Sequence, residues 1–383
     1  MTIKHHIYGI LLATLTGCAA DGPTGDNVIG PDGGLPVAGA VPITFGVAVE
    51  GSMSASTRAD ADSTRADATR AEDTYVHFAD GQTPYIYAYP ASVDVYNDFA
   101  ATNAYGGENG FVNLPLINTG KTVDASQDET GTEKYYQEFT VGSNNKYAYY
   151  PEDGTALQFY AYYPYVDAAG NETAIKRPYD IKPQYDIMVG ILQNGSNSFS
   201  KARNGETQEQ PKFIFYHLLQ QLRFKLVQGE GFPSNAVATE IRVKQIWSHV
   251  RVHPFRALTD DYIERPYEES GKTDISLPLS AGSKTYPISP LATAGEAGDV
   301  LMLDPRDTEF DIEVKVRFAD NTTHTFSTNI DLVAQGAVTS GAPISDNRGV
   351  SHLITLTFQG SKIIPQCKVA PWNTGGYKTI PVE

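Results

Sequence analysis

The sequence predicts an all-β protein with two sandwich-sized units, and three observations lead to this prediction. Segments of alternating apolar and polar residues recur along the chain, which is typical of strands with one buried face. Tyrosine and phenylalanine, which favour strands, occur 23 and 16 times. Gly, Pro and Asn separate the runs, as in chains of short strands joined by turns. We therefore expect β-sandwiches, and a chain of 383 residues suffices for about two of them.

The first 17 residues have the features of a lipoprotein signal peptide. A basic start at Lys4 precedes a short apolar run over 7–15, which is too short to span a bilayer. Gly17 and Cys18 then resemble the bacterial lipobox, in which the cysteine is acylated and the chain is cut before it. We expect a signal peptide over 1–17 and a lipid on Cys18. An ordinary signal peptide with an incidental cysteine is the alternative.

A tether follows the signal peptide. Residues 18–40 are rich in Gly, Pro and Asp, which predicts a flexible or extended segment that holds a folded body away from a membrane. Cys367 is the second of two cysteines, so acylation of Cys18 leaves no disulfide framework and no cysteine metal site.

A strand pattern opens the folded body. Apolar residues alternate with small ones and predict a half-buried strand at Ile43, Phe45, Val47 and Val49. The next segment, 51–74, repeats Thr-Arg-Ala three times, with Arg58, Arg65 and Arg70 at the centres. No large hydrophobe lies between these tripeptides, so we expect an exposed, protease-sensitive leash. A low-complexity linker without a cleavage role is the alternative.

Strand patterns continue to the C-terminus. In 310–318, apolar residues at every second position face one way and charged residues face the other. The run 213–227 is predicted as mostly strand, although its centre could form a helix. A Gly-containing break near 228–238 predicts an N-terminal sandwich over 41–228 and a C-terminal sandwich over 229–383. Further strand-like runs lie at 84–90, 135–141, 146–151, 157–165, 240–253, 324–332, 352–358 and 362–372.

Motifs of catalysis and cofactor binding are missing from the sequence. It contains no Gly-x-Ser-x-Gly and no Gly-rich phosphate loop, so we expect neither an enzyme nor a cofactor. His249 and His253 would suit a metal on a helix, but they lie in a strand pattern with Arg251 between them. His217, inside an apolar run, indicates a hydrogen-bonded core or edge histidine. The net charge of −16 repels nucleic acid and anionic lipid, so we expect no nucleic-acid partner.

Several segments, taken in order, resemble the fimbrillin family of Bacteroidia, the subunits of protease-assembled pili. The similar segments span nearly the whole chain. They are the lipobox at Cys18, the strand beginning at Ile43, the Thr-Arg-Ala repeats, "YIYAY" (85–89), "LQFYAYYP" (157–164), "DIMVG" (186–190), "FIFYHLLQQLRFKL" (213–226), "HLITLTF" (352–358) and "VAPWNTGG" (369–376).

The resemblance implies two tandem transthyretin-like β-sandwiches and a life cycle in three stages. The precursor is a lipoprotein of the outer membrane. An Arg-specific protease then cuts the leash, which removes the lipid together with the strand that plugs a groove. Finally, other pilin subunits of the same fibre fill the groove with a strand, and the protein becomes part of an extracellular fimbrium that supports adhesion to an unnamed surface ligand. Arg70 is the first candidate for the cut, followed by Arg58 and Arg65.

The role within the fibre is a separate question. Residues 373–383 follow Trp372, and a donor segment would have to use Tyr377, Ile380 and Val382. This short stretch favours a tip or minor subunit over a shaft subunit. A different class of function stays open, namely a monomeric surface lipoprotein that binds glycan or protein through tyrosine-rich strands, including Tyr160 and Tyr162.

Overall fold

The computed structural model describes thirteen stretches of the chain, and no α-helix occurs within them. Among these residues, no helix is long and apolar enough to cross a membrane. The described residues are 40–50, 77–78, 81–95, 114–127, 133–143, 146–165, 177–193, 198–201, 210–253, 263–265, 271–339, 347–370 and 372. The all-β prediction is confirmed.

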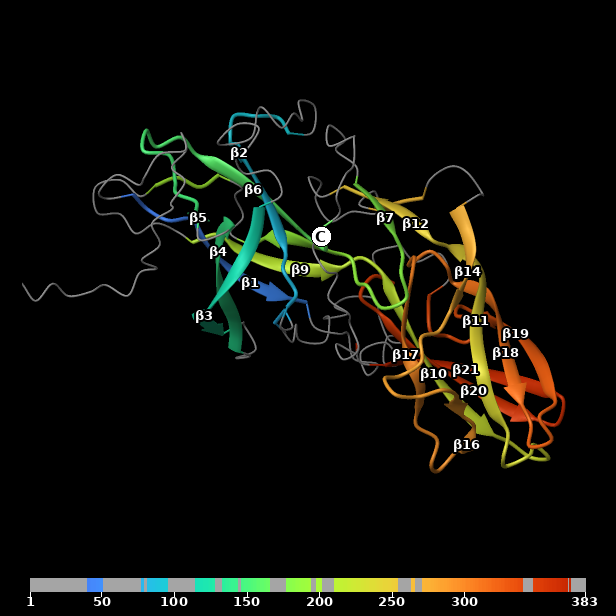
Figure 1. Ribbon diagram of the computed structural model, residues 1–383. Helices are drawn as coiled ribbons and strands as arrows, with labels where there is room; N and C mark the ends of the chain where they lie inside the picture. Colours follow the sequence, from blue (N-terminus) through green and yellow to red (C-terminus); the bar gives the residue numbers. More distant parts are fainter. Residues whose placement is uncertain are drawn as a thin grey trace, which may run out of the picture.

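Eight strands of the N-terminal half form one sheet at one end of the molecule (Figure 1). In their order across the sheet they are β1 (Thr44–Val49), β9 (Lys212–His217), β8 (Met188–Leu192), β6 (Leu157–Tyr163), β2 (Tyr85–Pro90), β3 (Leu114–Gln127), β4 (Glu133–Ser143) and β5 (Lys146–Tyr147). β1 also pairs with β4, so the seven strands from β1 to β4 close into a ring. This closure gives β1 two neighbours and leaves the ring without a free edge there.

Two five-stranded sheets make up the other end of the molecule (Figure 1). One contains β16 (Ser289–Pro290), β10 (Gln220–Gln228), β20 (Ser351–Gln359), β21 (Lys362–Ala370) and β17 (Glu296–Leu303), the last paired with β10. The second contains β14 (Lys272–Ser276), β11 (Val237–Trp247), β18 (Glu309–Arg317), β19 (Thr323–Asp331) and β15 (Tyr286–Pro287), the last paired with β11. Their inner faces share one hydrophobic core, which is the arrangement of a β-sandwich.

A small three-stranded sheet and a shared core connect the two ends. The sheet joins β7 (Arg177–Asp180) to β12 (His249–Val252), and β12 to β13 (Ile263–Glu264). The shared core contains Tyr87 from the first sheet, Leu218 from the two-residue link between β9 and β10, and Met302 from β17. Chain segments from both halves therefore pack against each other without an intervening layer of solvent-exposed side chains.

The predicted run 213–227 is strand, as expected, but it forms two strands in different sheets. β9 ends at His217 and β10 starts at Gln220. Leu218 and Leu219 between them are fully buried, and the Leu218 amide donates to the Ile187 carbonyl at 2.8 Å. The chain therefore crosses from one sheet to the next at two leucines. Periodicity does not reveal this crossing, because both strands and the crossing are apolar.

The sequence pattern predicts β18 correctly and misses β3, and each outcome has a physical reason. In β18 the alternate residues Phe310, Ile312, Val314 and Val316 are buried, as the pattern predicts. β3 was not predicted, because its sequence, LPLINTGKTVDASQ, is polar beyond its start. The domain boundary at 228/229 stays a prediction; β10, which precedes it, pairs with β17 and β20, which follow it.

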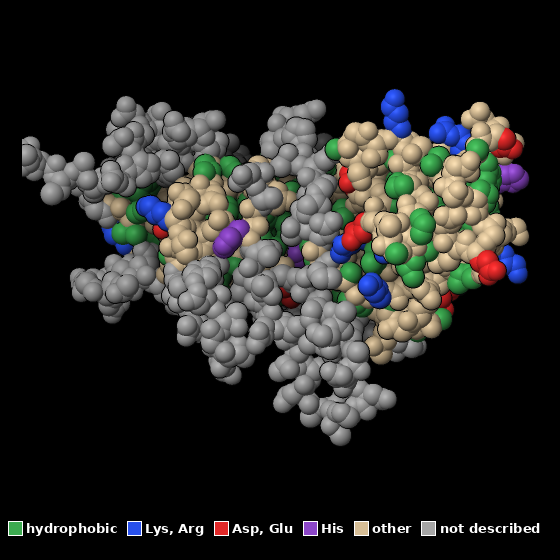
Figure 2. Space-filling view, turned by 90° about the horizontal axis from the view of Figure 1, so that it is seen from below, with side chains coloured by type: hydrophobic (Ala, Val, Ile, Leu, Met, Phe, Trp, Pro, Cys, Tyr) green, Lys and Arg blue, Asp and Glu red, His purple; other side chains and the backbone are tan. Residues whose placement is uncertain are grey.

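The surface of the later sheets is mixed in charge. On the face seen in Figure 2, acidic and basic side chains of the described residues are interspersed rather than gathered by sign. Charges of opposite sign are also paired on β11, where Lys244 lies within ion-pair distance of both Asp274 (2.7 Å) and Glu313 (3.3 Å). Charges of both signs that alternate over a surface limit the formation of large single-sign patches.

Candidate functional site: the β1 slot

β1 lies in a slot between β4 and β9. It runs antiparallel to β4, with Phe45 opposite Phe139, and parallel to β9, with Val47 beside Phe213. Hydrogen bonds beyond the ladders hold both its ends. The Ile43 amide donates to the Ala148 carbonyl at 2.8 Å, and the Glu50 amide donates to the Phe215 carbonyl at 2.8 Å. β1 is thus an interior strand of the ring, although it comes first in the folded body.

The inner face of β1 fills the core of the ring. The four apolar residues predicted from the alternation are all buried there: Ile43, Phe45, Val47 and Val49. Phe45 has no exposed surface and meets Phe159 edge-on, with ring centroids 4.9 Å apart, and Phe213 at 5.4 Å. These aromatic contacts come from β6 and β9, so the strand supplies part of the hydrophobic core.

A buried histidine–aspartate pair holds the chain where β1 ends. Nδ1 of His217 makes a short contact with Oδ2 of Asp186, and Nε2 lies 3.1 Å from the Glu50 carbonyl oxygen. Both partners of the ring are oxygen acceptors, so this geometry favours the imidazolium form, in which both ring nitrogens carry a proton. Burial lowers the pKa of His217, but the charge and hydrogen bond of Asp186 and the contacts with Glu50 outweigh it and raise the pKa above 6.5.

Two later segments surround the same histidine. The Trp372 ring, which follows β21, lies on the His217 ring with centroids 4.2 Å apart. Gly349, before β20, has a φ of +63°, and its amide donates to the Leu219 carbonyl at 3.0 Å. A side chain at position 349 would approach the His217 Cβ to 3.5 Å. The exit of β1 is therefore packed against both ends of the β20–β21 hairpin. The predicted hydrogen-bonded core role of His217 is confirmed.

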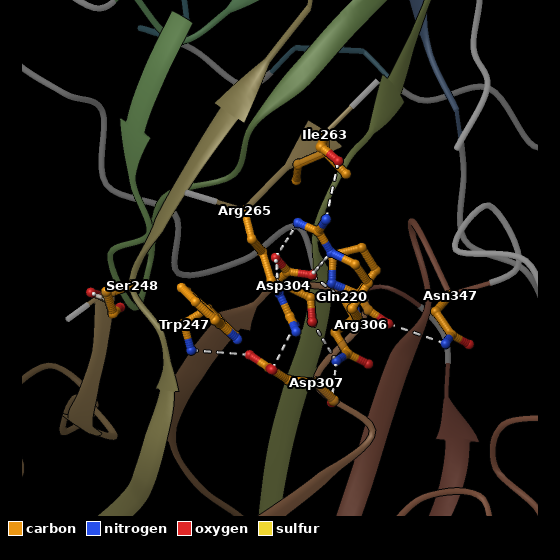
Figure 3. A network of polar contacts seen from close by, with 11 residues as sticks. Gln220, Trp247, Ser248, Ile263, Arg265, Asp304, Arg306, Asp307 and Asn347 are labelled. Carbon is orange, nitrogen blue, oxygen red and sulfur yellow. Dashed lines mark hydrogen bonds and ion pairs between the residues drawn. The ribbon is translucent and has the colours of Figure 1, made fainter. Parts of the chain in front are cut away.

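A second polar cluster lies beside the crossing from β9 to β10, on the side of the sandwich. Figure 3 shows Asp304 between Arg265 and Arg306, with Nε distances to its carboxylate of 3.0 and 2.8 Å. Burial raises the pKa of Asp304, but these two guanidinium groups outweigh it and lower the pKa below its ordinary value. Asp307 binds Arg265 at 2.6 Å, and burial together with the Asp304 charge raises its pKa to about 6. The cluster ties β13 to the loop after β17.

The structure does not describe every predicted site residue. Cys18, Arg58, Arg65 and Arg70 lie outside the described residues. Within the described part of the chain, no group of three or more His, Cys, Asp or Glu side chains could hold a metal ion. His249 is exposed and contacts Asp180 at 2.6 Å.

The tyrosines of the alternative function are not arranged as a ligand surface. Tyr162 has no exposed surface and packs against Tyr87, with ring centroids 5.6 Å apart. Tyr160 is partly buried, and its hydroxyl donates to Oε1 of Gln158 at 2.8 Å. A ligand could not reach Tyr162 without unfolding this region.

Sequence reasoning missed two features of the slot. One is the role of Asp186, which lies in a loop 31 residues before His217 and has no pattern to mark it. The other is the burial of the outer face of β1, because small residues at alternate positions indicate a solvent-facing side rather than a tightly covered one.

Comparison with known proteins identifies the family. A model of the fimbrillin-like family matches residues 69–372, which is well over half of the chain. The protein belongs to the fimbrillin-like family. Fimbrillins are structural subunits of pili and not enzymes, so the expectation of a non-enzymatic protein is confirmed by family membership. No match was found among curated proteins.

Solved structures of proteins from Bacteroides species are similar to this fimbrillin. A candidate cell adhesion protein of Bacteroides uniformis shares 14% identity with a TM-score of 0.47, over 88% of this chain and 100% of that one. Another from Bacteroides ovatus shares 15% identity with the same TM-score, over 88% and 99%. A fimbrial protein of Bacteroides vulgatus shares 12% identity with a TM-score of 0.38, over 86% and 98%.

Proposed function

We propose that this fimbrillin is a pilus subunit in which β1 is a removable plug that a strand from another subunit replaces. The observation that carries the proposal is the double pairing of β1 with β4 and β9. Loss of β1 would leave two facing strand edges with unpaired N–H and C=O groups beside apolar pockets. Such an opening accepts an extended segment by β-augmentation.

The removal step follows from the order of segments in the chain. β1 ends at Val49, and the three Thr-Arg-Ala repeats come before the next strand, β2. A cut after Arg58, Arg65 or Arg70 therefore separates β1, and everything before it, from the rest of the body. We propose Arg70 as the final site. Arginine suits a protease with an acidic specificity pocket, because its charge is permanent and its geometry is planar.

A lipid on the precursor would keep the subunit at the membrane until the leash is cut. We propose that an acyl chain on Cys18 holds the precursor at the outer membrane, and that the same cut releases the body into the extracellular fimbrium. Each large apolar side chain of β1 contributes roughly 1.5–3 kcal/mol when buried. The cut strand is therefore held firmly by its four inward residues, and we expect replacement by another strand rather than free dissociation.

The proposal extends to the architecture of the two units and to the position of the subunit in the fibre. We propose two tandem transthyretin-like sandwiches that meet near the predicted boundary, with β10 in the second one, and a tip or minor position in the pilus. Deletion of 373–383 tests the position. A tip subunit lacking this segment should still join a fibre, whereas a shaft subunit should no longer polymerise.

The alternative, a monomeric binding protein, has less support. It needs Tyr160 and Tyr162 to meet a ligand, and Tyr162 is fully buried. Glycan binding by the uncut chain that is lost on Tyr160→Ala would revive it.

Limited digestion of the folded chain with an Arg-specific protease tests the proposed function. We expect a clean cut at Arg58, Arg65 or Arg70, after which the β1 fragment stays bound until an added strand, such as a peptide with the sequence of 41–51, replaces it. The matched control replaces all three arginines with glutamine, which keeps the length and polarity of the leash. A cut wild-type chain that keeps its β1 fragment even with the added strand in large excess would contradict the proposal.

A further inference from the structure

The outer face of β1 is closely covered at two positions, Gly46 and Ala48. Gly46 lies beside Lys212 of β9 and opposite Glu138 of β4. The Lys212 ammonium lies 5.7 Å from the centroid of the Tyr136 ring, so the two side chains meet over the glycine. A Cβ atom at position 46 would lie 3.2 Å from Tyr136 Cβ and 3.3 Å from Lys212 Cγ. Both distances are shorter than ordinary van der Waals contact, so a larger side chain needs these neighbours to move.

The next outward position is restricted in the same way. Ala48 is 1% exposed and forms a small cluster with Tyr136 and Ile214, against which Tyr216 packs. Ile214 is its direct neighbour on β9. Extra methyl groups at position 48 would have to displace these packed side chains, because overpacking a filled site forces strain.

Thr44, the first outward position, differs from the other two. It is only half-buried, and its hydroxyl accepts a hydrogen bond from the Gln210 side chain at 2.9 Å. The restriction to small residues therefore applies to two specific positions and not to the whole outer face.

We propose that the β1 slot selects its occupant by both faces of the inserted strand, and that the occupant in the fibre is a strand of a second subunit with a defined pattern. The pattern is four large apolar residues at alternate positions, with glycine between the second and third and alanine or glycine between the third and fourth. This inference rests on the proposed replacement of β1 and adds the chemistry of the partner.

The chain's own segment after Trp372 does not carry this pattern. Its apolar residues Tyr377, Ile380 and Val382 are spaced by three and then by two, and Pro381 stands between the last two. Proline has no N–H to donate to either neighbouring strand. Residues 373–383 therefore do not match the pattern that the slot requires.

Peptide exchange into the cut full chain tests the selection rule. The chain is cleaved with the Arg-specific protease and mixed with the peptide VPITFGVAVEG, the sequence of 41–51. Native mass spectrometry then measures how much of the β1 fragment is replaced. Three variant peptides carry Gly46→Val, Ala48→Val and, as a control on the same face, Thr44→Val. A fifth peptide has the sequence of 373–383.

We expect the Thr44→Val peptide to exchange within about fivefold of the parent, because it loses one hydrogen bond of about 1 kcal/mol. We expect Gly46→Val and Ala48→Val to bind at least about tenfold more weakly than Thr44→Val, a difference of ~1.4 kcal/mol. The rule would be overturned if the Gly46→Val or the Ala48→Val peptide replaced the β1 fragment as well as the parent peptide does. The same holds if the 373–383 peptide replaced it as well as the parent. If no peptide enters, the proposed exchange of β1 fails. The rule is then decided in the intact chain, where Gly46→Val and Ala48→Val must lower the melting temperature more than Thr44→Val.

Discussion

His217 Nε2 lies 3.1 Å from the Glu50 carbonyl oxygen, so a buried residue of β9 holds the backbone at the point where β1 ends. Asp186 contacts the other nitrogen of the His217 ring, and the Trp372 ring lies against the face of the same ring. Leaving the slot therefore requires β1 to break a hydrogen bond to a charged donor as well as its two ladders. Hydrogen bonds to charged groups contribute about 1.5–3 kcal/mol, more than neutral ones.

The stabilisation that His217 gives to the end of β1 should decrease as the pH rises. Because the pKa of folded His217 is raised above 6.5, its contribution is present in full below pH 6.5 and is lost as the pH rises through the raised value. The groups facing the ring are Asp186, the Glu50 side chain and backbone, and Trp372. We expect the difference in melting temperature between the wild type and His217→Gln to be largest at acidic pH and to shrink at alkaline pH.

Thermal melts of both proteins from acidic to alkaline pH check this prediction. His249→Gln is the control, since His249 is exposed and its replacement should change the melting temperature little. A difference between the wild type and His217→Gln that does not vary with pH would show that the imidazolium does not contribute.

Shortening Phe45 should destabilise the whole ring. Its side chain is fully buried between Phe159 and Phe213, so Phe45→Ala leaves a cavity in the core. We expect a loss of ~3–5 kcal/mol in the free energy of unfolding, measured by urea denaturation. Thr44→Ala, the neighbouring residue, removes one half-buried hydrogen bond and should cost about 1 kcal/mol. Equal losses from the two changes would mean that β1 is not part of the core.

The effect of replacing Asp307 with asparagine should depend on pH. Relative to the wild type, the variant should be more stable at neutral pH than at acidic pH. Its folded pKa is about 6 against an ordinary 3.8, so the folded protein binds more protons between these values and wild-type stability falls as the pH rises through that window. Asp307→Asn stays neutral at every pH. The melting temperature of the variant relative to the wild type should therefore increase from pH 3.8 to pH 6 and then level off. A constant offset over this range would contradict the raised pKa.

Two neighbouring tyrosines should respond differently to truncation. Tyr162 is fully buried, so Tyr162→Ala should cost ~3–5 kcal/mol in the free energy of unfolding. Tyr160 is partly buried, so Tyr160→Ala should cost clearly less. Urea denaturation of the two variants checks this difference. A small cost at Tyr162, combined with lost ligand binding, would instead support the monomeric binding protein.

The local pattern of the sequence was enough to predict which side chains of β1 and β18 face a core. Side chains on a strand alternate with a period of two, so Ile43, Phe45, Val47 and Val49 share a face wherever the strand lies. The same reasoning identified His217 as a hydrogen-bonded core residue. It did not find β3, whose polar sequence forms a strand because β2 and β4 offer hydrogen-bonding edges on either side.

Sequence alone determined that this chain is a β protein, which face of β1 is apolar, and which segment links β1 to the rest. Only the tertiary structure decided the neighbours of β1, because β4 lies some 90 residues away and β9 more than 160, and nothing local encodes such a pairing. The same long-range pairing brings Tyr136 and Lys212 over Gly46 and places His217 at Glu50. A glycine and an alanine that resemble a solvent-facing side are thus covered, because closure of the ring places β4 and β9 on either side of β1 and their side chains lie over these two residues.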